Sequence, residues 1–153
     1  MAGPGITQQD LKIFKELGVI SQIRGLDSSG IYQVKSHIYS KGQHNFEGMY
    51  KTNGTFNDLL DDLDMTKNTP LLNNCQVDII MGHVRQATRG ACTRDNAHPF
   101  VHRDIVGMHN GTLRDEKFRH VTKTDSELMF TAMAWQGITE VLSALDKDSA
   151  YVV

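Results

Sequence analysis

Most polar residues that could carry out chemistry lie between positions 82 and 127 of the chain. Expected strands and a helix flank this segment and could hold its side chains rigidly. Taken singly, each of these residues more often serves a turn or the surface, because loops are polar whatever their function. A functional site is therefore expected only where several of these residues act in combination.

Four histidines of this segment raise the possibility of a bound metal: His83, His98, His102 and His109. Neutral imidazoles are common zinc ligands, and His98 and His102 have a spacing compatible with one face of a helix. However, Pro99 follows His98 directly, and no cysteine or carboxylate completes a familiar ligand set. We therefore predict no metal and no cofactor, and keep a His-ligated metal hydrolase as the weaker alternative.

The pair Asn110-Gly111 permits two interpretations. It favours a hairpin turn, because both residue types tolerate positive φ. Alternatively, the asparagine amide and a glycine N–H point at one place and stabilise an oxyanion, as acyl transfer requires. Asp125 is equally ambiguous, since a carboxylate stabilises the first turn of a helix whether or not it binds an amine. The residues alone leave both questions open.

The expected elements give a mixed helix and sheet order. Thr7 and Asp10 are typical of a helix start and predict a helix over residues 8–23. Apolar residues at near-helical spacing predict one buried stripe on it: Leu11, Phe14, Leu17, Ile20 and Ile23. Thr124 and Glu127 form a capping-box pattern that opens a second helix, which should end at Gly137.

The remaining elements follow from shorter patterns. They are strands at 31–39, 46–50, 77–81 and 105–108, a short helix opened by Thr55 and Asp58, a helix at 138–145 and the start of a strand at 150–153. This order indicates an α+β sheet layered with helices.

Length and composition limit the classes of protein that the chain can be. Its 153 residues have room for one ordinary domain, and 39% apolar and 22% charged residues are typical of a folded chain. A net charge of −2 argues against a dedicated binder of nucleic acid or anionic membranes. Two cysteines, with neither a transmembrane stretch nor a signal peptide, indicate a cytoplasmic protein.

Five sequence blocks together resemble the glutaminase domain of class II glutamine amidotransferases. In order along the chain they are RGLDSSGI at 24–31, GHVRQATRG at 82–90, NAHPF at 96–100, HNGTL at 109–113 and TDSE at 124–127. The resemblance implies a single domain over residues 1–153 with a four-layer αββα N-terminal-nucleophile fold. It also implies hydrolysis of the glutamine side-chain amide and transfer of ammonia to an acceptor synthase domain or subunit.

The resemblance also assigns roles to individual residues. Arg85 would hold the α-carboxylate of glutamine, assisted by Thr88, which agrees with the bidentate fork that arginine offers to carboxylates. Asp125 would bind the α-amino group. Asn110 and Gly111 would form the oxyanion hole. Gln86 and Arg89 replace the tryptophan and histidine of many relatives at the pocket rim.

One departure concerns the nucleophile, which the family supplies as an N-terminal cysteine. This chain begins Met1-Ala2, and Cys92, in the loop after Arg85, is a poor substitute. We expect a domain truncated at both ends, partial and inactive as it stands, whose opening strand with the cysteine is absent. The alternative is a glutamine-binding or structural module that has lost its nucleophile. An upstream reading frame encoding Met-Cys-Gly would favour the first interpretation.

Overall fold

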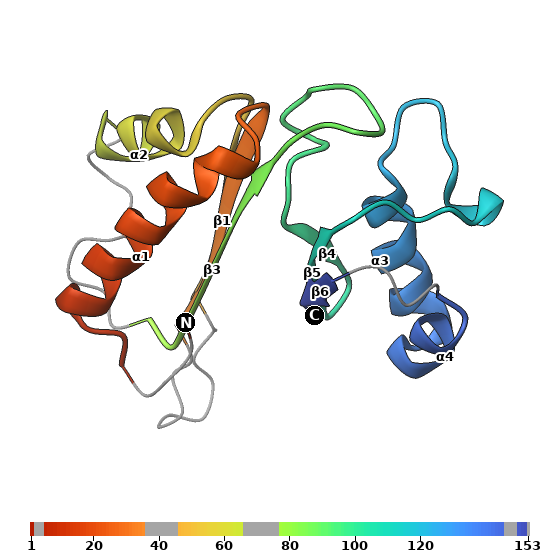
Figure 1. Ribbon diagram of the computed structural model, residues 1–153. Coiled ribbons are helices and arrows are strands. Elements are labelled where there is room, and N and C mark those ends of the chain that lie inside the picture. Colours follow the sequence, from red (N-terminus) through yellow and green to blue (C-terminus); the bar gives the residue numbers. More distant parts are fainter. Residues whose placement is uncertain (2–4, 36–45, 66–76, 146–149, 153) are drawn as a thin grey trace.

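The computed structural model describes residues 1, 5–35, 46–65, 77–145 and 150–152, which contain both helices and strands (Figure 1). The expected α+β class is therefore confirmed. The elements gather around two antiparallel sheets, each of three strands. In the described ranges, no helix is long and apolar enough to cross a lipid bilayer.

The first sheet has the strand order β2-β1-β3. Its strands are β1 at Ser28–Lys35, β2 at Phe46–Thr52 and β3 at Ile79–Arg85. The strand expected at 77–81 begins and ends later, because its pairing with β1 continues as far as Arg85, which lies opposite Ser28. Positions 36–39 of the first expected strand lie outside the described residues. Arg85 is consequently held at the end of β3 by its pairing with the central strand β1.

Two helices pack on the first sheet: α1 at Gln8–Ser21, extended by the 3₁₀ turn η1 at Gln22–Arg24, and α2 at Phe56–Met65. The predicted cap of α1 is confirmed, since the Asp10 N–H donates to Thr7 Oγ1 at 3.2 Å and the Thr7 N–H donates to the Asp10 carboxylate at 2.9 Å. The predicted end is two residues too long, because the chain tightens into η1.

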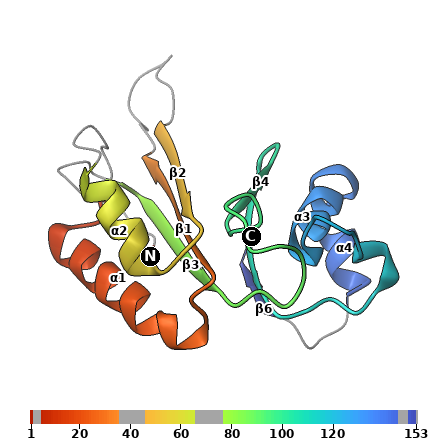
Figure 2. The ribbon, with the colours of Figure 1, turned by 90° about the horizontal axis from the view of Figure 1, so that it is seen from above.

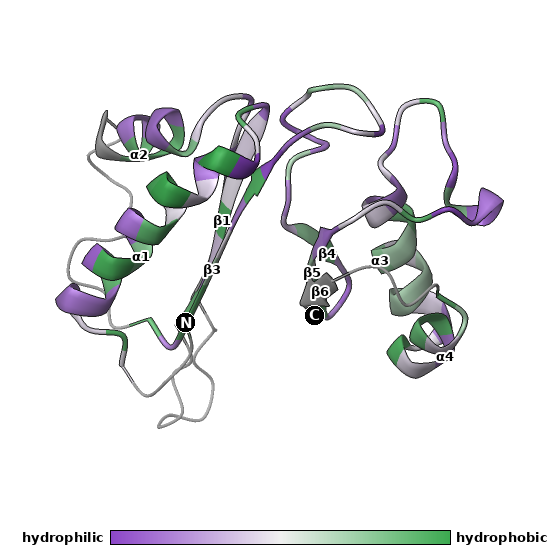
Figure 3. Cartoon of the chain, in the orientation of Figure 1, coloured by the Kyte–Doolittle hydropathy of each residue, from purple (hydrophilic) through white to green (hydrophobic). Residues whose placement is uncertain are grey.

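The predicted buried stripe on α1 is only partly correct. Leu11 and Phe14 are buried, whereas Leu17, Ile20 and Ile23 are 52%, 62% and 88% exposed. The buried face of α1 meets α2, where the rings of Phe14 and Phe56 lie edge to face with centroids 6.1 Å apart. A helix that packs on one sheet and one neighbour covers a narrower stripe than its apolar pattern indicates. In Figure 3 the turns of α1 carry both apolar and hydrophilic residues.

The second sheet has the order β4-β5-β6, with β4 at Phe100–His102, β5 at Ile105–Asn110 and β6 at Ala150–Val152. Three helical segments accompany it: α3 at Asp125–Gln136, α4 at Ile138–Ser143 and the 3₁₀ turn η2 at Glu116–Phe118. The predicted cap at Thr124 and the predicted end at Gly137 are both confirmed. Strand β4 was not expected from the sequence.

A separate apolar core joins α3 and α4 to the second sheet. Its most buried members are Phe100, Leu113, Phe118, Met129, Phe130, Met133 and Val141. The ring of Phe130 lies directly against Gly107, where any side chain on the strand would overlap it. Outside this core, the Arg103 guanidinium lies 3.4 Å from the ring centre of Trp135, which is 69% exposed.

The two sheets contact each other between the helical pairs (Figures 1 and 2). The rings of His83 and His98 lie 4.2 Å apart, and Lys51 Nζ lies 4.8 Å from the ring centre of Phe100. Gly30 of β1 lies against the carbonyl oxygen of His98, so that a β-carbon there would overlap it. This close approach brings the ends of β3 and β5 near each other.

Candidate functional site

A cavity of about 420 Å³ opens where β3, β5 and α3 meet. It has the size of a pocket for a small molecule. All five residues to which the resemblance assigns a role line this cavity: Arg85, Thr88, Asn110, Gly111 and Asp125. Three segments that are distant in sequence therefore contribute to one concave surface.

Arg85 enters the cavity from the end of β3, with only 6% of its surface exposed. Its two terminal nitrogens donate to backbone carbonyls of the following loop, Nη1 to Ala91 at 3.4 Å and Nη2 to Arg89. Because a guanidinium has five N–H donors, these contacts orient the group and leave three donors for a ligand. Burial lowers the pKa of the Arg85 guanidinium, which nevertheless stays positively charged at neutral pH.

Asp125 is the first residue of α3 and is 5% exposed. Its Oδ2 accepts the Leu113 N–H at 2.7 Å, and its Oδ1 accepts the Ser126 N–H at 3.0 Å. Each oxygen keeps a second lone pair that could accept from an ammonium group. The cavity therefore has a fixed cation and a fixed anion.

Asn110 and Gly111 lie at the end of β5. The hairpin-turn interpretation is wrong, because the strand that pairs with β5 after Gly111 is β6, which follows only after η2, α3 and α4. Gly111 has φ 147°, in the region that favours glycine. Opposite this pair, Thr88 Oγ1 lies 3.2 Å from Thr112 Oγ1.

Three histidines line the inner part of the cavity: His83, His98 and His109. Burial lowers the pKa of His83 to about 4 and that of His98 well below its ordinary value, and it also lowers the pKa of His109. All three are therefore neutral at pH 7. Four of their buried ring nitrogens have no hydrogen-bond partner among the described residues.

Sequence reasoning treated these histidines only as candidate metal ligands. In the described ranges, no group of three His, Cys, Asp or Glu side chains is placed to hold a metal ion. His109 Nδ1 instead lies 2.8 Å from Ser126 Oγ, a pocket residue that sequence reasoning missed. Its position directly after Asp125 in the capping motif was the available signal.

Of the two cysteines, only Cys92 lies among the described residues. Cys92 is free and exposed, and it is not among the residues that line the cavity. Cys75 lies outside the described residues.

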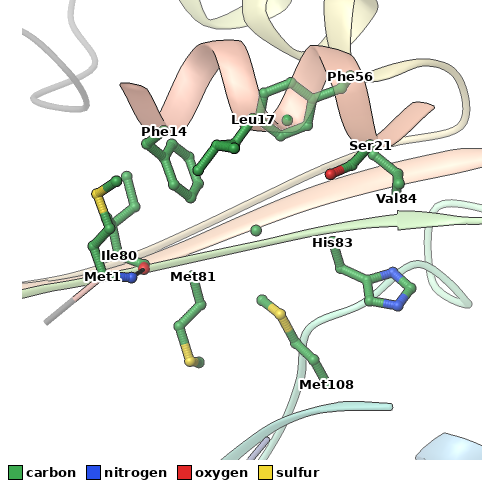
Figure 4. A pocket seen from close by; sticks show the side chains of 12 residues that line it. Met1, Phe14, Leu17, Ser21, Phe56, Ile80, Met81, His83, Val84 and Met108 are labelled. Carbon is green, nitrogen blue, oxygen red and sulfur yellow. Dashed lines mark hydrogen bonds between the residues drawn. The ribbon is translucent and has the colours of Figure 1, made fainter. Parts of the chain in front are cut away.

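A second cavity, of about 340 Å³, runs along β3 between α1 and Met108 of β5 (Figure 4). At one end Met1 pairs with β3, since its amino group donates to the Ile80 carbonyl at 2.9 Å and its carbonyl accepts the Ile80 N–H at 2.9 Å. At the other end lie His83 and Val84, and His83 also lines the first cavity. The two cavities therefore adjoin.

The α+β fold thus has a cavity, lined by Arg85 and Asp125, of a size that suits a small molecule. Residues 48–148 match the family described as Glutamine amidotransferases class-II. The match covers two-thirds of the chain and includes all five cavity residues named above, and the chain belongs to this family. Comparison with curated proteins gives no match.

Proposed function

We propose that residues 1–153 form a cytoplasmic glutaminase domain with the four-layer αββα N-terminal-nucleophile arrangement. In this proposal the cavity binds glutamine, and once a nucleophilic cysteine is supplied the side-chain amide is hydrolysed to glutamate and ammonia for an acceptor synthase domain or subunit. The observation that carries the proposal is that Arg85, Asn110 and Asp125, from three distant segments, line one cavity.

The charges of the cavity match the two ends of an α-amino acid. The free donors of Arg85 would bind the α-carboxylate together with Thr88, and the free lone pairs of Asp125 would bind the α-amino group. The Asn110 amide and the Gly111 N–H would then stabilise the oxyanion that forms at the side-chain carbonyl. Each charged or reacting group of glutamine thus has a partner from this chain.

Amide hydrolysis by covalent catalysis also needs a nucleophile. The edge of β3 offers a route for one, because the reciprocal bonds between Met1 and Ile80 are those of an antiparallel pair. A strand joined to the N-terminal side of Met1 in this register would run toward Arg85. Its third residue before Met1 would lie opposite His83, and its fifth would lie opposite Arg85.

The faces to which the side chains of β3 point show which residues of the added strand would be directed at the cavity. Ile80 packs in the core beneath α1, and a β-carbon on Gly82 would meet Phe14 of that helix. His83 and Arg85, in alternation with them, line the proposed glutamine cavity. Because paired residues point to the same face, the third and the fifth residues before Met1 would both point toward the cavity, and the fifth would lie beside Arg85. The second cavity provides space along this path (Figure 4).

The experiment compares the 153-residue chain with a version that carries five added residues, the first of which is a cysteine exposed by removal of the initiator methionine. We expect glutamate and ammonia release from the extended chain and none from the original. Replacing the added cysteine by alanine is the first control. Inserting one more residue after it is the second, because this turns the thiol to the opposite face. Release by the original chain, or none by the extended one, would contradict the proposal.

In the active extended chain, the site residues should separate by their kinetic effect. Arg85→Ala and Asp125→Ala should mainly raise KM, because they remove partners of the unreacting end of glutamine. Asn110→Ala should lower kcat by about 100- to 1000-fold, the usual effect of losing one oxyanion donor. An unchanged kcat in Asn110→Ala would rule out the oxyanion assignment.

A further inference from the structure

Asn96 has a buried polar side chain that bridges two loops beside the proposed glutamine cavity, and it does not line that cavity. It belongs to the block Asn96–Phe100, to which the proposed function gives no role. Its side chain is 4% exposed. The Nδ2 group donates two hydrogen bonds of 3.0 Å, one to the Ala91 carbonyl and one to the Thr122 carbonyl. One amide group therefore joins two segments that are 31 residues apart.

Each of these segments holds one of the two charged groups of the cavity. The Ala91 carbonyl also accepts from Arg85 Nη1, so that Asn96 and Arg85 share an acceptor. On the other side, Thr122 is two residues before Thr124, whose hydroxyl caps α3 and so fixes the helix turn that presents Asp125. The two hydrogen bonds of Asn96 thus hold the two segments that position Arg85 and Asp125.

Gly90 packs into the same junction. Its φ is +74°, and a β-carbon there would lie 3.2 Å from Asn96 Nδ2 and 3.2 Å from Thr124 Cγ2. The absence of a side chain at Gly90 lets the loop after Arg85 approach the cap of α3. The junction is therefore tight as well as hydrogen bonded.

We infer that Asn96 is a positioning residue that sets the separation of the Arg85 guanidinium and the Asp125 carboxylate, and thereby the selectivity of the cavity for an α-amino acid. This inference rests on the proposed function. Binding both the carboxylate and the amine of one ligand requires both partners at a fixed distance. Without the Asn96 bridge, each partner can still attract its own charge, but the two no longer act on one ligand together.

The test measures the affinities of the 153-residue chain for L-glutamine and for 4-carbamoylbutanoate, which is glutamine without its α-amino group. NMR titration is suitable because it quantifies weak binding. We expect the wild type to prefer L-glutamine by about tenfold or more, the typical value of a hydrogen bond to a charged group. In Asn96→Leu, which removes both donors at similar size, the preference should fall below about threefold. Asp125→Ala gives the preference when the amine partner is absent.

Asn53→Leu is the matched control, because Asn53 is an exposed asparagine in the turn between β2 and α2. It should leave the preference unchanged. If Asn96→Leu fails to fold, Asn96→Ser, whose hydroxyl can donate one of the two bonds, should give an intermediate preference. Gly90→Ala should lower the preference by forcing the same junction apart.

The possible outcomes separate the inference from the function on which it rests. A wild type that binds neither ligand overturns the proposed function and the role of Asn96 with it. A wild type that prefers L-glutamine, with an Asn96→Leu variant that weakens both ligands equally or neither, leaves the function standing and overturns the positioning role. A loss of preference in the variant supports both.

Discussion

Helices α1 and α3 have the same kind of threonine N-cap but differ in how much of their apolar surface is buried. Thr7 accepts the Asp10 N–H and Thr124 accepts the Glu127 N–H, so that each helix starts with a threonine cap. Yet α3 buries Met129, Phe130 and Met133 almost completely, whereas α1 leaves Leu17 and Ile20 more than half exposed. Local sequence therefore determines where a helix starts, while its neighbours determine how much of it is buried.

This difference in burial affects the parts of the two helices that border the cavities. α3 presents Asp125 from a first turn in which Asp125 and Ser126 are buried. By contrast, Leu17 of α1 is 52% exposed and lines the open cavity along β3. We therefore expect the α3 half to be rigid and sensitive to substitution, and the outer face of α1 to be tolerant.

The largest expected effect comes from removing the core of the α3 half. Phe130→Ala should lower the free energy of unfolding by about 3–5 kcal/mol, because Phe130 is 0% exposed and packs on Gly107. The matched change Leu17→Ala on α1 should cost less than about 1 kcal/mol, since half of that side chain remains in water. Urea unfolding followed by circular dichroism measures both, and equal costs would contradict the comparison.

A somewhat smaller effect is expected from acid, which acts where the two halves meet. His83 from β3 has a pKa lowered to about 4 by burial, against an ordinary value of 6.5. Because the unfolded chain binds this proton more readily, the stability from His83 is complete above pH 6.5 and is lost as the pH falls toward 4. The loss should reach about 3 kcal/mol. His98 and His109 act in the same direction.

The contribution of His83 to this acid sensitivity can be isolated. His83→Gln should flatten the fall in unfolding free energy between pH 6.5 and 4, as measured by urea titrations at each pH. His120→Gln is the control, because His120 is exposed in the loop before α3. The same slope in wild type and His83→Gln would show that the buried imidazole is not the source.

The smallest expected effect compares the two caps directly. Thr124→Ala should cost about 1–2 kcal/mol and Thr7→Ala about 0.5–1 kcal/mol, because Thr124 is 1% exposed whereas Thr7 is exposed. Only Thr124→Ala should also weaken glutamine binding, since it loosens the turn that carries Asp125. Unfolding free energies and NMR titration of both variants provide the measurement. If both variants changed glutamine binding equally, the Thr124 cap would have no specific role in positioning Asp125.

The parts of the fold that could be predicted are those with local causes. Capping patterns at Thr7 and Thr124 and the stop at Gly137 gave both long helices to within two residues. Strand β4 has only three residues and is defined by its pairing, with Phe100 opposite Gly107, so that no local pattern indicates it. Burial of Leu17 was wrongly predicted because periodicity shows which face is apolar, not how much of that face is covered.

For the site, residue type alone left the main questions open. The Asn110-Gly111 pair favoured a turn that the sheet does not form. The convergence of Arg85 with Asp125 was expected only through resemblance, because 40 residues separate them and nothing local brings them together. The bridge made by Asn96 was not foreseeable, since its partners are backbone carbonyls whose positions follow from two loops.

The stacking of Arg103 on Trp135 determines what tryptophan fluorescence can report in these measurements. Trp135 is the single tryptophan of the chain, and it is already 69% exposed in the folded protein. Its emission will therefore change little in wavelength on unfolding. What it will report is the guanidinium 3.4 Å from its ring centre, so that intrinsic fluorescence is a local probe of the β4–β5 turn against α3.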